Sequence, residues 1–157
     1  MNRRHTARLL AIAVRPPGGR EMRELQRAGV SVEAGLAGDK RSRPGRRQVT
    51  LMSLKVWQQV CVELGAALPW TTRRANLLVD DLPLFQSHGG RIRIGEVELE
   101  ITGETDPCAK MEAAHTGLFE ALRPEWRGGV TCRVLQGGEL EVGQALELVM
   151  ACEILGG

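Results

Sequence analysis

Aromatic side chains are scarce in this sequence: they make up 3% of its 157 residues, and tyrosine is absent. The core must therefore consist mainly of Leu, Val, Ile and Ala side chains, which suits many short strands packed together. Few aromatic rings also argue against a single-stranded nucleic-acid partner, because the bases would lack rings to stack on. The length is that of one ordinary domain, so we expect a single domain over residues 1–157.

Long apolar runs and targeting signals are lacking as well. No stretch approaches the roughly 18 apolar residues of a membrane span. The basic start of the chain leads into the short apolar run 9–14, without the cleavage site of a secretory signal. The formal net charge of +2 is too small to indicate nucleic-acid binding. We therefore expect a soluble, cytoplasmic protein with no membrane or nucleic-acid partner.

The four cysteines form no CxxC pair and have no histidine at metal-finger spacing, which argues against a structural zinc site. In a reducing cytoplasm they should be free thiols. Cys61 falls on the apolar face of a predicted helix, and Cys132 alternates in phase with two valines of a predicted strand. Both are therefore expected in the core, whereas Cys152 lies in a glycine-ended tail with no evident partner.

Apolar runs bounded by turn residues predict strands at 9–14, 29–32, 48–52 and 77–79, and at least two more within 130–149. Helices are predicted at 54–64, with Ser53 as N-cap and Gly65 at the end, and at about 107–113 and 117–122. Helices and strands do not alternate regularly, and no Gly-rich nucleotide-binding motif follows a strand. The sequence therefore predicts a mainly β fold, a strand-dominated barrel with a few helices.

The segment 91–102 has the clearest local pattern, a strict alternation interrupted by the turn Gly95-Glu96. The implied hairpin register pairs apolar residues on one face and charges on the other: Ile94 with Val97, Ile92 with Leu99, Arg93 with Glu98, and Arg91 with Glu100. One face of this hairpin should be buried and the other should face water.

Cys108 differs from the other cysteines because it follows a helix-start signal. Asp106 suits the N-cap and Pro107 the first helical position, which would place Cys108 at the second. There the helix dipole and Lys110 would lower the pKa of the thiol, while the carboxylates of Asp106 and Glu104 would oppose that effect. The alternative is that Cys108 is a small buried hydrophobe like most free cysteines.

Two clusters of cations are further candidates for binding. The loop 40–47 holds five Lys or Arg residues, which could bind a phosphorylated cofactor or simply form a solvated surface loop. The segment 72–76 places two arginines and an amide before a predicted strand, where they could bind an anion or cap the sheet. No catalytic serine motif is visible, and helical spacing does not indicate a pair of Cys108 with His115.

A set of short motifs follows in order along the chain: Gly38-Asp39-Lys40, Arg46-Arg47-Gln48-Val49-Thr50-Leu51, Arg74-Ala75-Asn76-Leu77-Leu78-Val79, Asp106-Pro107-Cys108, Arg127-Gly128-Gly129-Val130 and the glycine-rich ending 134–143. In their order and spacing they resemble the motifs of the MOSC family, named after the C-terminal domain of molybdenum-cofactor sulfurases. The resemblance runs from about residue 9 to residue 149. Ala75 stands where proline is common in the family, and Arg41 where histidine is frequent.

The resemblance implies a β-barrel like that of pyruvate kinase and an essential cysteine, here Cys108. That residue would be catalytic, either as a ligand of molybdenum or as the carrier of a persulfide, and a thiolate suits both roles. The family's pterin-binding segment corresponds to Arg74 and Asn76. The other residues that it implies for cofactor binding are Lys40, Arg46, Arg47, Thr105 and Asp106.

Three functions follow as hypotheses. The chain is a molybdopterin-binding component of a reductase acting on N-hydroxylated or related substrates, a sulfur carrier, or a non-catalytic cofactor-binding module. We favour cofactor binding because the implied cations fall in three separate groups, Lys40, Arg46 with Arg47, and Arg74, which sulfur relay alone would not require. The pyridoxal-phosphate domain of larger members is lacking, so a cysteine desulfurase or an electron donor should be a separate protein. The substrate and the oligomeric state stay open.

Overall fold

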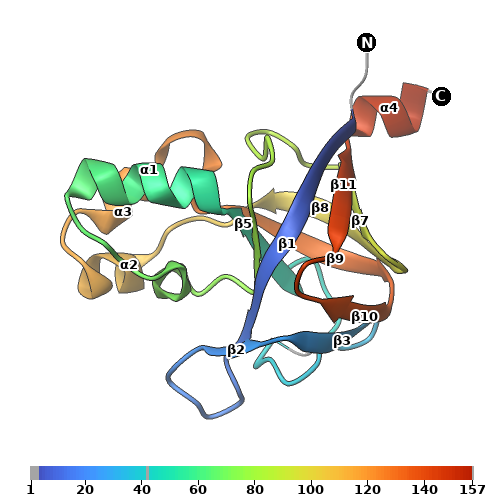
Figure 1. The fold of residues 1–157 in the computed structure, drawn as a ribbon, viewed down its shortest axis with the longest axis horizontal. Helices are drawn as coiled ribbons and strands as arrows, with labels where there is room; N and C mark the ends of the chain where they lie inside the picture. The colour runs from blue at the N-terminus through green and yellow to red at the C-terminus, as the bar shows by residue number, and fades with distance from the viewer. Residues whose placement is uncertain (1–3, 42, 157) are drawn as a thin grey trace.

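Seven strands close into a barrel in the computed structural model, which describes residues 4–41 and 43–156. Their order is β11-β7-β8-β9-β5-β6-β1, and antiparallel pairing of β1 with β11 completes the ring (Figure 1). The strands are β1 (Arg4–Val14), β5 (Val49–Ser53), β6 (Leu77–Val79), β7 (Arg91–Ile94), β8 (Val97–Glu104), β9 (Val130–Gln136) and β11 (Ala145–Val149). The predicted mainly β fold class, a barrel with a few helices, is confirmed.

Four further strands lie beside the barrel. β2 (Arg23–Leu25) pairs with β1, and a separate small sheet has the order β10-β3-β4. Its strands are β3 (Arg27–Ser31), β4 (Gly35–Leu36) and β10 (Gly138–Glu141). The strand predicted near 29–32 is therefore part of the small sheet, and the tail holds β9, β10 and β11 where at least two strands were expected.

Helices α1 (Leu54–Leu64), α2 (Ala109–Ala114) and α3 (Leu118–Leu122) gather on one side of the barrel (Figure 1). As predicted, Ser53 caps α1 by accepting a hydrogen bond from Val56 N, and Gly65 ends it at φ 65°. Gly117, also with positive φ, precedes α3. The sequence did not predict the two short 3₁₀ helices, Trp70–Arg73 and Pro124–Trp126, or the C-terminal α4 (Ala151–Gly156).

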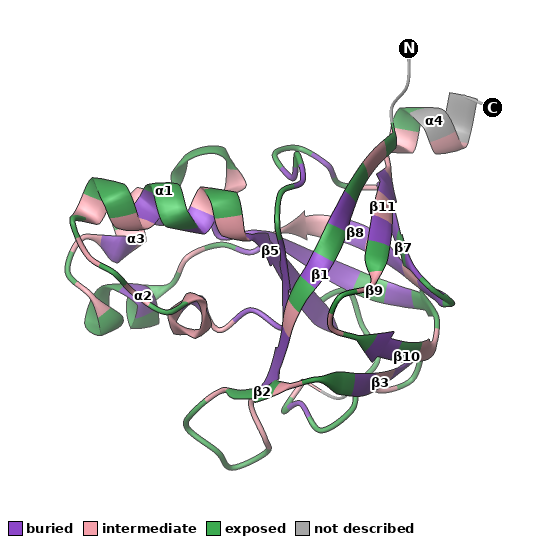
Figure 2. Ribbon diagram, viewed as in Figure 1, coloured by how far each residue is buried: buried purple, intermediate pink, exposed green. Residues whose placement is uncertain are grey.

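The parallel pair β5 and β6 joins the barrel to this helical side. α1 and the first 3₁₀ helix connect the two strands, and the side chains of each strand alternate between two buried faces. Leu51 and Leu77 point into the barrel core, whereas Met52 and Leu78 pack beneath the helices. All five residues of β5 are therefore buried (Figure 2).

The hairpin β7–β8 has the predicted register, and its four inward side chains, Ile92, Ile94, Val97 and Leu99, are fully buried. The outer charges pair differently from the expectation in one respect. Arg91 and Arg93 both contact Glu98, at 3.6 and 3.7 Å, while Glu100 contacts Arg133 of the next strand at 3.9 Å. Long side chains reach diagonal neighbours, so the backbone register does not fix which charges meet.

The cysteines divide as the sequence suggested. Cys132 is fully buried in the barrel, Cys61 is half-buried on the apolar face of α1, and Cys108 and Cys152 are exposed; all four are free thiols. Over residues 4–41 and 43–156 no cluster of three or more His, Cys, Asp or Glu side chains is arranged to hold a metal ion. None of the helices in those ranges has the length and hydrophobicity that a membrane-spanning segment requires.

Because Cys132 is buried, we expect the stability of the fold to depend on pH in the alkaline range. Burial raises the pKa of its thiol from 9.0 to about 12, so the folded state keeps a proton that the unfolded state loses. Stability should therefore fall as the pH rises through this range. In Cys132→Ala the free energy of unfolding, measured by urea titration at a series of pH values, should fall less steeply between pH 9 and pH 12. Cys152→Ala is the control, and equal slopes for Cys132→Ala and the wild type would contradict the prediction.

Candidate functional site

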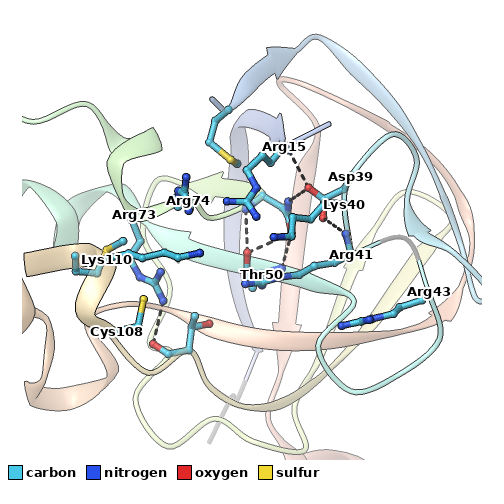
Figure 3. A pocket seen from close by; sticks show the side chains of 14 residues that line it. Arg15, Asp39, Lys40, Arg41, Arg43, Thr50, Arg73, Arg74, Cys108 and Lys110 are labelled. Atoms are coloured by element: carbon cyan, nitrogen blue, oxygen red, sulfur yellow. Dashed lines mark hydrogen bonds between the residues drawn. The ribbon is translucent and has the colours of Figure 1, made fainter. Parts of the chain in front are cut away.

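A cavity of about 290 Å³ opens outside the barrel, where β5 and the entrance to β6 face α2. Segments that are far apart in sequence meet there (Figure 3). The lining residues are Arg15, Met22, Asp39, Lys40, Arg41, Arg43, Thr50, Arg73, Arg74, Asn76, Thr105, Cys108, Lys110 and Met111. Seven of these side chains are cationic and one is a carboxylate, so the cavity suits an anion.

The one carboxylate of the cavity, Asp39, is occupied by the protein itself. Its Oδ1 accepts hydrogen bonds from Arg15 N at 2.9 Å and from Asn76 Nδ2 at 3.3 Å, and its Oδ2 accepts one from Arg41 N at 3.1 Å. Asp39 is only 4% exposed. It therefore holds the backbone at Arg15 and at Arg41, in the loop 40–47 (the cationic loop). Because Asp39 is already bonded in this way, it leaves the positive charges around the cavity largely unneutralised.

Asn76, which the sequence suggested as a cofactor-binding residue, has its side chain fully bonded within the protein. Its Oδ1 accepts from Thr50 N and Thr50 Oγ1, at 3.0 and 3.2 Å, and its Nδ2 donates to Ala13 O and to Asp39. These bonds tie β1, β5 and the cationic loop together at the cavity wall. Asn76 therefore holds the wall of the cavity in place through bonds within the protein.

Arg73 lies in the segment 72–76 that the sequence suggested for anion binding, but it was not among the predicted cofactor-binding residues. It is 6% exposed, its Nε donates to Gly128 O at 3.1 Å, and its Nη2 donates to Thr105 O at 3.1 Å. A Cβ atom on Gly128 would lie 2.8 Å from Thr105 O and 3.0 Å from Arg73 Nε. Gly128 therefore leaves the space that the guanidinium occupies. The pair Gly128-Gly129 indicates that another group packs closely against this backbone, but the sequence alone does not identify that group as the Arg73 side chain.

The charge of Arg73 is buried without a carboxylate partner among the described residues. Burial lowers its pKa to about 10, an effect that the negative charge of ionised Cys108 opposes and that Arg41 and Arg47 reinforce. The guanidinium nevertheless stays protonated at neutral pH. Two backbone carbonyls are weak compensation for a buried charge, so an anion in this cavity would be held strongly.

Arg74 lies at the open side of the cavity. Its backbone is left-handed, with φ 67°, an unusual conformation for a residue with a side chain. The turn sends Arg73 inward, while the side chain of Arg74 stays partly exposed and donates to Arg20 O at 3.1 Å. Both neighbouring arginines line the cavity, Arg73 with a buried side chain and Arg74 with a partly exposed one.

Cys108 lines the cavity with an exposed side chain, beside the guanidinium of Arg73 (Figure 3). The predicted start of its helix was wrong by two residues. Cys108 is itself the N-cap of α2, with extended backbone at φ −130° and ψ 173°, and Asp106 and Pro107 precede the helix. Bonds from Thr105 N to Gly129 and from Arg73 to Thr105 O hold the preceding chain to the barrel, which keeps it extended.

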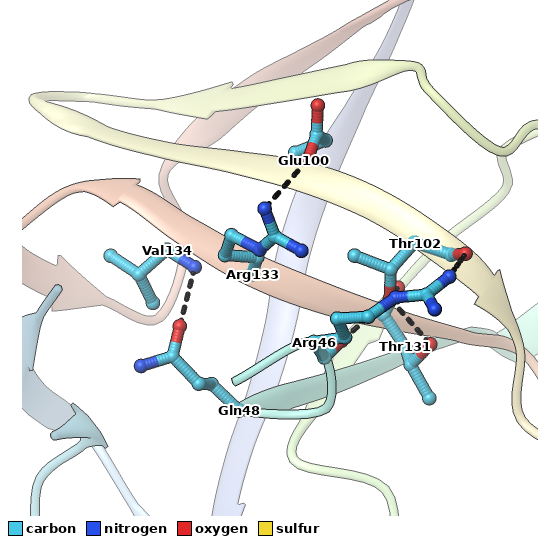
Figure 4. Close-up of polar contacts among 7 residues, drawn as sticks. All are labelled: Arg46, Gln48, Glu100, Thr102, Thr131, Arg133 and Val134. Carbon is cyan, nitrogen blue, oxygen red and sulfur yellow. Dashed lines mark hydrogen bonds and ion pairs between the residues drawn. The ribbon is translucent and has the colours of Figure 1, made fainter. Parts of the chain in front are cut away.

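The remaining predicted residues divide between two places. Lys40 and Thr105 line the cavity with Cys108, whereas Arg46 and Arg47 line a neighbouring cavity formed by the cationic loop. Arg46 is held against β8, where its carbonyl accepts a hydrogen bond from Thr102 Oγ1 at 2.5 Å (Figure 4). Asp106 is exposed and acts on the site through its charge, which raises the pKa of Arg73.

Gly128→Ala tests whether the cavity depends on the space around Arg73. The added methyl group should displace the guanidinium from Thr105 O and lower the free energy of unfolding by about 1–3 kcal/mol, the usual cost of overpacking. Gly103→Ala is the matched control, because its Cβ would meet no atom within 4 Å. Urea titration of both variants measures the difference, and equal stabilities would show that Arg73 does not need this space.

The comparisons with known proteins agree with the fold. The family model of the MOSC domain matches residues 24–147. The YuaD protein of Bacillus subtilis is similar in structure, with a TM-score of 0.77 and 20% identity over 94% of this chain and 98% of that one. YiiM of Geobacillus stearothermophilus has a TM-score of 0.74 and 17% identity, over 94% and 81% of the two chains.

YiiM of Escherichia coli has a TM-score of 0.66 and 18% identity, over 91% of this chain and 74% of that one. No curated protein sequence matches the chain significantly. The structural similarities are at low identity and bear on the fold, while the family model spans most of the chain. By that match, the chain belongs to the MOSC domain family.

Proposed function

We propose that the protein binds a molybdenum cofactor of the molybdopterin type, with Cys108 as a ligand of the metal. One observation carries the proposal: an exposed thiol shares a cavity with seven cationic side chains and a single carboxylate that is already bonded. A phosphorylated cofactor supplies the negative charge that such a cavity attracts. Thiolate is also a soft ligand of the kind that transition metals accept.

The residues present fit this group. The described residues offer no cluster of three metal ligands, so a metal at Cys108 must bring most of its own ligands, as a pterin dithiolene would. The hydroxyl of Thr105 is buried in the cavity wall without a hydrogen-bond partner among residues 4–41 and 43–156, which leaves it available to a ligand. The cavity volume of about 290 Å³ lies close to the lower limit, about 300 Å³, of the usual range for ligand sites.

The side chains divide the work as follows in the proposal. Lys40 and Arg74 hold the phosphate at the open side, where both can reach it, and Arg46 and Arg47 add positive charge from the adjoining loop. Asn76 and Asp39 position the walls. Cys108 ligates the metal, and Thr105 binds the ligand through its free hydroxyl. When bound, the cofactor supplies the two-electron chemistry by which N-hydroxylated compounds are reduced, with electrons from a separate donor protein.

Metal analysis of protein from a molybdenum-competent host tests the proposal. Wild-type protein should carry molybdenum and pterin in near-equal amounts, measured by elemental analysis and by the fluorescence of released, oxidised pterin. Cys108→Ser should lose most of the metal because the cavity has no other thiolate, whereas Cys152→Ser, which alters the other exposed cysteine, should keep it. Wild-type protein without molybdenum, or equal loading of both variants, would contradict the proposal.

A sulfur carrier is the second candidate, and the exposure of Cys108 favours it. In this function the Cys108 thiolate attacks the outer sulfur of a persulfide on a cysteine desulfurase. The sulfur–sulfur bond of the donor breaks, Cys108 gains a persulfide, and the donor leaves as a thiolate. After incubation with a desulfurase and cysteine, intact-protein mass spectrometry should then find one added sulfur atom. That adduct on metal-free protein, lost in Cys108→Ser, would favour the carrier over the cofactor-binding protein.

A further inference from the structure

We propose that Arg73 and Thr105 form an oxyanion-binding subsite at the buried end of the cavity, beside Cys108. This proposal rests on the proposed function only because both concern the same cavity. It names the class of chemical group that binds at the buried end of that cavity. That class is an oxygen-bearing anionic group, such as a phosphate, a carboxylate or the charged oxygens of a substrate. The reasons are three features of the inner wall.

The first feature is the set of donors that Arg73 leaves unused. A guanidinium has five N–H groups. In the described chain, the hydrogen bonds of Arg73 are the one from Nε to Gly128 O and the one from Nη2 to Thr105 O. The remaining N–H groups belong to a side chain that lines the cavity. They have the fork arrangement that binds two oxygens of one anion.

The second feature is the hydroxyl of Thr105. Its Oγ1 is buried and has no hydrogen-bond partner in the described part of the chain, although Thr105 is only 5% exposed. An unpartnered buried hydroxyl costs the folded protein stability, so it calls for a partner from outside the chain, such as a water molecule or a ligand oxygen. Thr105 is joined to Arg73 through its own carbonyl, so the free hydroxyl and the guanidinium belong to one rigid unit.

The third feature is the space that the backbone leaves for the guanidinium of Arg73. Gly128 leaves space for the guanidinium, because a Cβ atom there would lie 3.0 Å from Arg73 Nε and 2.8 Å from Thr105 O. Other cations of the cavity are more accessible: Lys40, Arg43 and Lys110 are exposed, and Arg74 is partly exposed. Arg73, by contrast, is buried beside Cys108 and held by two backbone carbonyls, so a group bound to it would be positioned next to the thiol.

The alkylation of Cys108 by two reagents tests this subsite. In both reactions the thiolate displaces iodide, but iodoacetate carries a carboxylate and iodoacetamide does not. The ratio of the two rates cancels the reactivity of the thiol and reports the binding of the anion. Peptide mass spectrometry on the full-length protein gives this ratio at Cys108 and, in the same molecules, at the exposed Cys152.

The ratio of the iodoacetate rate to the iodoacetamide rate should be about tenfold higher at Cys108 than at Cys152. Thr105→Val keeps the charge and the shape of the site, so it should lower the Cys108 ratio severalfold without lowering the unfolding midpoint. Thr131→Val is the matched control: Thr131 is 4% exposed and its Oγ1 contacts Thr102 Oγ1 at 2.8 Å. That variant should lose stability and keep the ratio.

Arg73→Met and Arg73→Lys supply a second line of evidence. Both should lower the Cys108 ratio, because methionine removes the charge and lysine removes the fork. An unchanged ratio in Thr105→Val and in Arg73→Lys would overturn the subsite, since the general field of the cavity would then explain the preference. Equal ratios at Cys108 and Cys152 in the wild type would overturn it as well.

Inorganic phosphate distinguishes the two sources of the anionic group. Phosphate should slow the reaction of iodoacetate with Cys108 in cofactor-free protein, and its ³¹P signal should broaden on binding to wild-type protein but much less with Thr105→Val. If cofactor-loaded protein still broadens the signal, the subsite receives a substrate; if it does not, the phosphate of the cofactor fills it. Protein that binds phosphate here but never carries molybdenum would support the subsite while contradicting the proposed function.

Discussion

A buried guanidinium without a carboxylate partner in the described chain is the constraint around which the candidate site is built. Arg73 is held by two backbone carbonyls, from Gly128 and Thr105, in a space that only glycine at position 128 leaves free. A buried charge with so little compensation is unfavourable for folding alone. A bound anion would compensate this charge, and the other cations around the cavity also favour an anionic ligand.

The barrel supplies the rigidity that such a site needs. Thr50 lies on β5, Thr105 follows β8, and Gly128 precedes β9, so three neighbouring strands of one closed sheet fix the inner wall. Asp39 and Asn76 then tie the cationic loop to that wall through buried hydrogen bonds. The parallel pair β5 and β6 places α1 and the turn carrying Arg73 and Arg74 over the outer face. The exposed thiol of Cys108 lies between the barrel and α2, at the residue that caps the helix.

Local sequence patterns predicted much of this fold, because turns, helix caps and the alternation of side chains depend on residues that are close in sequence. The register of the hairpin β7–β8 follows from alternation and its turn, and the limits of α1 follow from Ser53 and Gly65. The start of α2 was misplaced because tertiary bonds at Thr105 override the helix-start signal of Asp106 and Pro107. The sequence drew attention to Cys108, but choosing between Arg73 and Arg74 required knowing which side chain the turn sends inward. Likewise, Arg46 and Arg47 carry the right charge but face a neighbouring cavity.

In the proposed function, a thiol, a cationic cavity and a buried arginine form one binding site for a phosphorylated metal cofactor. The position of the metal tests this proposal most directly. Anomalous diffraction at the molybdenum absorption edge, from crystals of cofactor-loaded protein, locates the metal directly. We predict a single anomalous peak within bonding distance of Cys108 Sγ, in the cavity that Arg73 lines. A molybdenum peak elsewhere on the protein would contradict the account.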